Sequence, residues 1–254
     1  MRNNRHIDLT YLQQLLFILV ILLVMNSCRK SNPLDCFNST GPDITQDRTS
    51  GTFNKIVLYN NVNLVITQDS VNSIKMVAGE NIIDRVTTSV NKGTLVIENT
   101  NTCNWTRNFN REIIAYVKVK NLSGIDYRGS GDISSTNTIT SDSLVLNIWE
   151  GAGKVDLNIK TQRNYIYFHI GTADVYYSGH THLSYITAAS FGPIDARNLS
   201  SVYTFMANKG SNNCFVNASL HLGATISSIG NVYYLGDPDI SLSDTGDGEL
   251  IKME

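Results

Sequence analysis

The sequence predicts an all-β fold, a parallel β-helix (solenoid) of about 18–22 residues per coil. Three observations predict it. A five-residue unit that begins with Gly or Ser and ends with an apolar residue recurs at nearly fixed intervals. Strand-like alternation of apolar and polar residues flanks the units. No segment after residue 50 carries the i, i+3, i+4, i+7 apolar stripe of a helix.

A repeated corner unit is the strongest of these observations. Its seven copies start at steps of 22, 20, 19, 20, 18 and 18 residues. The first position is Gly or Ser in every copy: Gly129, Gly151, Gly171, Ser190, Gly210, Ser228 and Gly246. The fifth position is apolar in every copy: Ile133, Val155, Val175, Ile194, Cys214, Val232 and Leu250. Because glycine readily adopts positive φ, the unit is interpreted as a tight corner followed by the first inward residue of a strand.

Strands are predicted on both sides of the corner unit, because apolar and polar residues alternate there. The side chains expected to face the core before the units are Leu144, Leu146, Ile148, Ile166, Phe168, Leu183, Tyr185, Tyr203 and Phe205. The alternation resumes after the unit, as in Val155, Leu157 and Ile159. At about 20 residues per coil, residues 51–254 would make roughly ten coils.

The N-terminal part of the domain is also strand-like but fits the repeat less closely. Its candidate strands lie at 53–69, 73–80, 94–100 and 113–121, with a turn at 91–93. Two arrangements are open: early coils with longer insertions, or a small antiparallel cap at the N-terminal end of the solenoid. A cap would protect an end of the stack that otherwise exposes unpaired strand edges.

The first 27 residues are predicted to be a lipoprotein signal peptide. Arg2 and Arg5 precede an apolar run, Leu15–Met25, which has the length of a signal core and is short for a membrane-spanning helix. A small residue then leads to Cys28, the expected site of lipidation. An ordinary cleaved signal and an uncleaved anchor are the alternatives, and each of them also exports the chain.

The predicted organisation is a signal peptide at 1–27, a tether at 28–50 and a β-helix domain at 51–254. A lipid on Cys28 would anchor the protein to a membrane of the cell envelope, with the outer membrane as the expected one. The residues after Cys28 carry no acidic run, so a periplasmic and a surface-exposed position both stay open. The sequence does not set the oligomeric state.

The remaining cysteines divide into two kinds. Cys36 and Cys103 lie in loop-like sequence and form the candidate disulfide, because an exported compartment permits such bonds. The bridge would close a long loop and stabilise the fold by about 4 kcal/mol; free thiols are the alternative. Cys214 occupies the apolar position of a corner unit, so it is expected to be a buried thiol.

Six stretches of the chain resemble the auto-transporter adhesin head GIN domain family, which occurs in lipoproteins of Bacteroidetes-like bacteria. They are "FNKIVLYNNVNLVITQD", "VNKGTLVIENT", "YRGSGDIS", "WEGAGKVDL", "IGNVYYLGDPDI" and "GDGELIK". The resemblance covers about residues 50–254 and implies a right-handed parallel β-helix in the cell envelope. It implies a fold more than an activity, and the units at 190–194 and 210–214 depart from the family's Gly-x-Gly pattern.

The residues argue against several other classes of function. A formal net charge of −2 is unlike the basic surface of a nucleic-acid-binding protein. The sequence lacks the carboxylate cluster of a polysaccharide-cleaving β-helix, regular calcium-binding nonapeptides and a Gly-x-Ser-x-Gly elbow. The pair His180 and His182 has no further ligand at metal-binding spacing. No catalysis, cofactor or metal is therefore expected.

The candidate ligand-binding surface is aromatic. Tyr127, Trp149 and His169 each precede a corner unit by two residues, and Tyr167 lies on the same predicted outward face as His169. Exposed rings with polar neighbours suit a glycan or a protein ligand, and stacking that only stabilises the sheet is the alternative.

The function expected from these features is that of an envelope lipoprotein that presents a rigid β-helix for adhesion or ligand binding. A polysaccharide-acting enzyme built on a β-helix is one alternative. An envelope scaffold or sensor with a protein partner is another.

Overall fold

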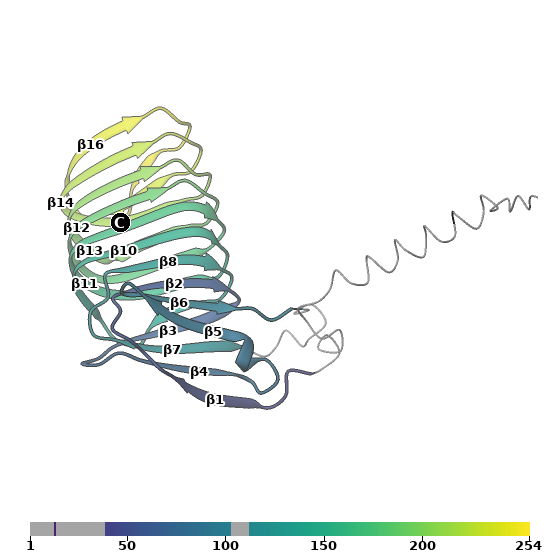
Figure 1. Ribbon diagram of the computed structural model, residues 1–254. Coiled ribbons are helices and arrows are strands. Elements are labelled where there is room, and N and C mark those ends of the chain that lie inside the picture. The colour runs from purple at the N-terminus through teal and green to yellow at the C-terminus, as the bar shows by residue number, and fades with distance from the viewer. Residues whose placement is uncertain (1–12, 14–38, 103–111) are drawn as a thin grey trace, which may run out of the picture.

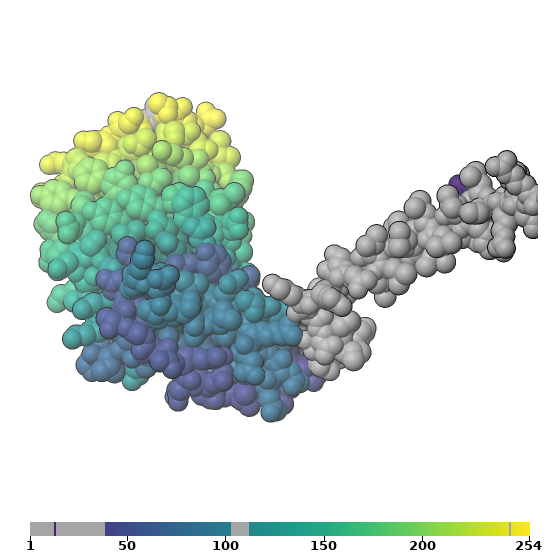
Figure 2. All heavy atoms as spheres, in the orientation of Figure 1, coloured from purple at the N-terminus to yellow at the C-terminus, as the bar shows by residue number. Residues whose placement is uncertain are grey.

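The computed structural model describes residue 13 and residues 39–102 and 112–254. The described domain is a β-solenoid of about six turns, which confirms the predicted fold class. Its coils stack from a purple and blue N-terminal end to a yellow C-terminal end (Figures 1 and 2). Within the described residues, no helix is both long and apolar enough to span a membrane.

Two parallel ladders of strands form the walls of the solenoid. We call the strands that follow the corner units the A ladder and those that precede them the B ladder. The A ladder contains β7 (Ile113–Val119), β3 (Val62–Gln68), β9 (Ile133–Ser135), the opening halves of β11 (Lys154–Gly171), β12 (Asp174–Ala188), β13 (Ile194–Asn208) and β14 (Cys214–Ile226), then β15 (Val232–Leu235) and β17 (Leu250–Lys252). The B ladder contains β6 (Thr94–Asn99), β2 (Lys55–Asn60), β8 (Gly124–Gly129), β10 (Ile139–Gly151), the closing halves of β11 to β14, and β16 (Asp239–Asp244).

The repeated corner unit is confirmed as a structural column. All seven predicted inward residues pair in register from coil to coil along the A ladder, from Ile133 to Leu250. The first six are buried, whereas Leu250 in the last strand is half-buried. Cys214 is the buried member expected from the sequence, and burial raises the pKa of its thiol to about 12.

The corners also explain why their first positions are small. A Cβ atom at Gly171 would lie 2.3 Å from the Gly151 carbonyl oxygen of the coil below. At Ser190 the side chain fits, and its Oγ accepts a hydrogen bond from the Gly171 N–H and donates one to the Gly171 carbonyl, each at 2.7 Å. At this corner serine is therefore tolerated, because its hydroxyl satisfies the backbone of the neighbouring corner.

An antiparallel cap closes the N-terminal end of the solenoid, as one of the two open arrangements predicted. β4 (Ser73–Gly79) pairs antiparallel with β7, and β1 (Asp43–Arg48) pairs antiparallel with β4. β5 (Val86–Asn91) follows the short 3-10 helix η2 (Ile83–Arg85) and forms a hairpin with β6. The hairpin turn has positive φ at Lys92 and Gly93, as a tight two-residue turn requires. Asp43–Arg48, which the sequence analysis placed in the tether, is thus part of the folded cap.

The prediction of roughly ten coils is corrected to about six turns. The difference arises in the N-terminal half, where β1, β4 and β5 build the cap instead of coils. The coil made by β2 and β3 also lies between β6–β7 and β8–β9, so the order in space departs from the order in the chain.

The inward face of the B ladder is predicted correctly in two strands and wrongly in two. Leu144, Leu146, Ile148, Ile166 and Phe168 are buried as expected. In β12 and β13 the alternation has the opposite phase, so Leu183, Tyr185, Tyr203 and Phe205 do not enter the core. One buried column there is polar, because Asn164, Ser184 and Thr204 stack in register inside the solenoid. The next inward column is apolar, with Ile186 paired to Met206. Hydrophobicity alone therefore indicated the wrong face.

Candidate functional site

A continuous set of rings covers the outward face of the B ladder. We call it the B-face aromatic row, and it consists of Trp149, Tyr165, Tyr167, His169, Tyr185, Phe205 and His221. The row exists because parallel in-register coils place like positions of successive strands next to one another. Tyr165, Tyr185 and Phe205 are such a column, since each pairs with the next along the ladder.

Ring contacts join the row along and across the strands. From coil to coil, centroids lie 6.4 Å apart between Tyr165 and Tyr185 and 6.4 Å apart between Tyr185 and Phe205. The row continues from Phe205 to His221 at 5.7 Å. Tyr167 links Tyr165 to His169, with centroid distances of 6.3 Å and 6.2 Å. These spacings leave the rings side by side in one surface rather than face to face.

The other end of the row is a tighter cluster. Trp149 and His169 stack face to face, with centroids 3.7 Å apart and planes 9° apart. The Arg128 guanidinium lies 5.5 Å from the centre of the Trp149 ring. Burial, together with the positive charge of Arg128, lowers the pKa of His169, while Asp126 opposes this. His169 is therefore mainly neutral at neutral pH and stacks as an uncharged ring.

Three of the four predicted binding residues lie together in this row: Trp149, Tyr167 and His169. Tyr127 does not, and its predicted exposure is corrected. Its side chain is fully buried, and its hydroxyl donates a hydrogen bond to the Gly131 carbonyl (2.7 Å) and accepts one from the Gly153 N–H (2.8 Å). The Tyr127 hydroxyl therefore joins two successive corners by hydrogen bonds from the inside of the solenoid.

A bulge explains why Tyr127 and Trp149 face opposite ways although both precede a corner glycine by two residues. Tyr127 pairs with Ile148, which is buried, so Trp149 as the next residue of the strand faces outward. The register then shifts between Trp149 and Gly151, and Glu150 is the extra residue, with a φ of 66°. Because of this bulge, equal spacing from the corner glycine does not place Tyr127 and Trp149 on the same face.

The remaining candidate residues lie elsewhere. His182 makes an edge contact with Tyr203, with centroids 5.3 Å apart. Across the described parts of the chain, no three His, Cys, Asp or Glu side chains are grouped as a metal site requires. Cys28, Cys36 and Cys103 fall outside the described residues, so the lipidation site and the disulfide stay predictions.

A second set of rings lies on the outward face of the A ladder, and it differs in its surroundings. We call Tyr176, Phe215 and Tyr233 the A-face rings, which pair in one column along β12, β14 and β15 with Asp195 between the first two. Lys154 Nζ lies 5.0 Å from the Tyr176 ring centre and Arg197 Cζ lies 4.4 Å from that of Phe215. Phe215 and Tyr233 stack at 4.9 Å. Cations of the protein itself therefore lie over two of the three rings of this set.

Four members of the B-face row were missed by sequence reasoning: Tyr165, Tyr185, Phe205 and His221. The alternation of apolar and polar residues predicts that Tyr185 and Phe205 face the core, whereas both lie on the outward face. The signal that could have found them is the polar run Asn164, Ser184 and Thr204, each one residue before a ring, at a step of 20 residues.

Comparison with known proteins agrees with this architecture. The family described as "Putative auto-transporter adhesin, head GIN domain" matches residues 52–238. The chain belongs to this family. The resemblance seen in the sequence is thus confirmed, and membership in an adhesin family points to the cell envelope or surface rather than to an enzyme. Among curated proteins, none matches the chain.

Solved structures share the fold of this GIN-domain protein. A "putative adhesin" from Bacteroides fragilis has a TM-score of 0.78 at 24% identity, covering 85% of this chain and 100% of that one. A "putative adhesin" from Parabacteroides distasonis has a TM-score of 0.63 at 16% identity, covering 85% and 99%. A "Putative lipid binding protein" from the same species has a TM-score of 0.63 at 18% identity, covering 84% and 98%. At these identities the likeness establishes the fold.

Proposed function

We propose that this GIN-domain protein is a lipid-anchored adhesin of the cell envelope that binds a glycan or protein ligand through the B-face aromatic row, without catalysis. Family membership and the predicted lipidation of Cys28 support the location. One observation carries the binding role. Among the described residues, no Lys or Arg lies over Tyr165, Tyr167, Tyr185 or Phe205, although such cations lie over two of the three A-face rings.

Exposed rings of this kind gain free energy when a ligand covers them. Tyr185 is 39% exposed and Phe205 is 40% exposed. Each Å² of apolar surface removed from water contributes roughly 25 cal/mol, and rings in contact along a rigid ladder need no reordering before they bind. A flat row suits the apolar face of a sugar ring or an extended peptide better than a small ligand that needs full enclosure.

The binding role is tested by Trp149→Ala in the full-length protein, solubilised in detergent and applied to arrays of glycans and of candidate proteins. Because Trp149 is an aromatic anchor at one end of the row, its loss should weaken binding by about 1–3 kcal/mol. Tyr176→Ala is the matched control, since Tyr176 and Trp149 are 38% and 37% exposed on different faces. Equal affinity of wild type and the Trp149 variant for every ligand would contradict the proposal.

Catalysis and lipid binding are tested on the same samples. The proposal expects no cleavage of any glycan that binds, and detectable bond cleavage would support the enzyme alternative. Phospholipid vesicles test whether the protein shares the lipid binding named for its Parabacteroides relative. If the wild type binds vesicles and Trp149→Ala does not, the ligand of the row is a lipid rather than a glycan or a protein.

The anchor has its own test. Cys28→Ala removes the thiol that a diacylglycerol would modify, so the variant should leave the membrane fraction and appear in the soluble fraction. Unchanged partition would contradict lipidation at this residue and leave the uncleaved-anchor alternative.

A further inference from the structure

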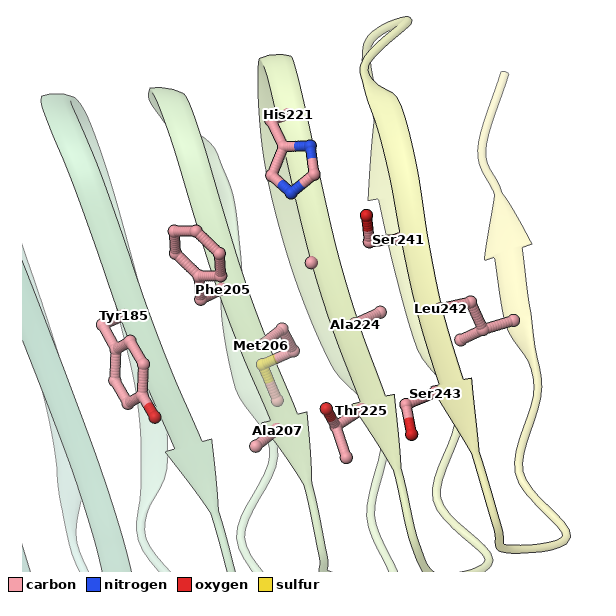
Figure 3. A pocket seen from close by; sticks show the side chains of 11 residues that line it. Tyr185, Phe205, Met206, Ala207, His221, Ala224, Thr225, Ser241, Leu242 and Ser243 are labelled. Atoms are coloured by element: carbon pink, nitrogen blue, oxygen red, sulfur yellow. The ribbon is translucent and has the colours of Figure 1, made fainter.

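A hollow of about 440 Å³ adjoins the C-terminal end of the B-face aromatic row. Phe205 of β13 and His221 of β14 form its aromatic side, and Ser241 and Ser243 lie on the last B-ladder strand, β16 (Figure 3). Its volume lies within the range of small-ligand sites, which is roughly 300–1,000 Å³.

The hollow exists because the column of rings is interrupted. Tyr165, Tyr185 and Phe205 are followed in register by Gly223 and then by the small Ser241. Gly223 has no positive φ, so its backbone does not require glycine. The space favours glycine, because a Cβ there would lie 2.8 Å from the Phe205 Cδ1 atom and the exposed Phe205 ring would have to shift. Any larger residue would push the Phe205 ring and fill the hollow.

Free polar groups surround the aromatic side of the hollow. Thr225, Ser241 and Ser243 contribute hydroxyls, and His221 contributes an imidazole. Three of these four are exposed and His221 is half-buried. Within the described part of the chain, none of the four side chains hydrogen-bonds to another protein group, so each can donate to or accept from a ligand.

The charge of the lining residues limits the chemical class of the ligand further. No Asp, Glu, Lys or Arg is among the residues that line the hollow. An anionic or cationic ligand would therefore lack a counter-charge, and an acyl chain would leave the hydroxyls without partners. A neutral pyranose ring matches both features, because its C–H face stacks on an aromatic ring while its hydroxyls exchange hydrogen bonds with Ser, Thr and His.

We propose that this hollow is a subsite for one neutral hexopyranose unit of a glycan. The inference rests on the proposed binding role of the aromatic row and names the ligand class at its C-terminal end. Phe205 stacks on the sugar ring, His221 and the three hydroxyls contact the sugar hydroxyls, and Gly223 keeps the space open. Because the hollow is open to solvent, the sugar can remain linked to neighbouring units that lie along the row.

The test measures binding of methyl hexosides of glucose, galactose, mannose and N-acetylglucosamine to the full-length protein in detergent, by saturation-transfer NMR and calorimetry. At least one neutral hexoside should bind. Phe205→Ala should weaken that binding about tenfold or more, and Gly223→Leu, which fills the hollow, should abolish it. Circular dichroism and thermal unfolding establish that each variant is folded. Tyr176→Ala lies on the outward face of the A ladder and should leave hexoside binding unchanged.

The possible outcomes separate the subsite from the binding role of the row. Failure of every neutral hexoside, or equal binding of glucuronate, overturns the subsite. Full hexoside binding by folded Phe205→Ala and Gly223→Leu proteins also overturns it. If the subsite is overturned in one of these ways but Trp149→Ala still weakens the binding of a ligand found on the arrays, the proposed function stands without the subsite. If hexosides bind as expected but Trp149→Ala affects no array ligand, the subsite stands and the role of the row fails.

Discussion

The two outward faces of this solenoid carry aromatic residues in different surroundings. On the A face, Lys154 and Arg197 lie over Tyr176 and Phe215, and these cations are themselves paired with Asp156 at 2.7 Å and Asp195 at 2.8 Å. On the B face, among the described residues, no Lys or Arg lies over Tyr165, Tyr185 or Phe205, and these rings contact other rings of the row. We infer that stacked rings on a solenoid can have two uses, which the neighbours of the rings distinguish. In this proposal, rings with the chain's own cations over them stabilise the sheet, whereas rings without such cations are available to a ligand.

The largest expected effect concerns a ring that belongs to neither face. Tyr127→Ala removes a fully buried side chain and should lower the free energy of unfolding by about 3–5 kcal/mol. Tyr127→Phe keeps the ring but leaves the Gly131 carbonyl and the Gly153 N–H without their partner, for an expected loss of about 1–3 kcal/mol. Denaturant unfolding measures both.

Ligand binding by folded Tyr127→Phe should match that of the wild type, because the hydroxyl lies inside the solenoid. A selective loss of affinity with unchanged stability would restore Tyr127 to the binding surface and contradict the assignment of the faces.

A smaller effect is expected from the A face. Arg197→Ala removes the cation over Phe215 and the ion pair with Asp195, both near the surface. The free energy of unfolding should fall by about 0.5–1 kcal/mol, because exposed cation–π contacts and ion pairs are weak. Ligand affinity should not change. A loss of affinity in this variant would mean that the A face, rather than the B face, contacts the ligand.

The smallest expected effect is a titration at the Trp149 end of the B-face row. The pKa of His169 should lie below its ordinary value, and Arg128→Gln should raise it because a repelling charge is removed. Since the unfolded chain binds this proton more readily, the fold loses stability as pH drops through about 6.5 toward the lowered pKa. NMR titration of the imidazole measures this, and a His169 pKa at or above the ordinary value would contradict the stacked, uncharged cluster.

The sequence was informative wherever backbone geometry imposes a residue type. The corner column from Gly129 to Gly246 and the inward column from Ile133 to Leu250 were both readable, because a coil of fixed length repeats a steric constraint. The N-terminal end was less readable. There β2 and β3 insert between later strands, and pairing across such separations leaves no periodic trace in a single sequence.

The candidate site was only partly predictable for a related reason. Faces were assigned by hydrophobicity, which fails where Ser184 and Thr204 point inward and Tyr185 and Phe205 point outward. The bulge at Glu150 could not be foreseen either, because spacing from a corner glycine does not record an extra residue. Sequence patterns therefore assign the wrong face where the fold buries polar residues and exposes aromatic rings.

The most direct test of the account compares Phe205→Ala with Phe215→Ala in the full-length protein, by the affinity of each for the tightest ligand found on the arrays. Both variants delete the same ring from neighbouring strands, one from the uncovered B face and one from beneath Arg197 on the A face. We expect Phe205→Ala to lose about 1–3 kcal/mol of binding free energy and Phe215→Ala to bind like the wild type. Equal losses from the two variants, or a loss confined to Phe215→Ala, would contradict the claim that the B-face aromatic row is the binding surface.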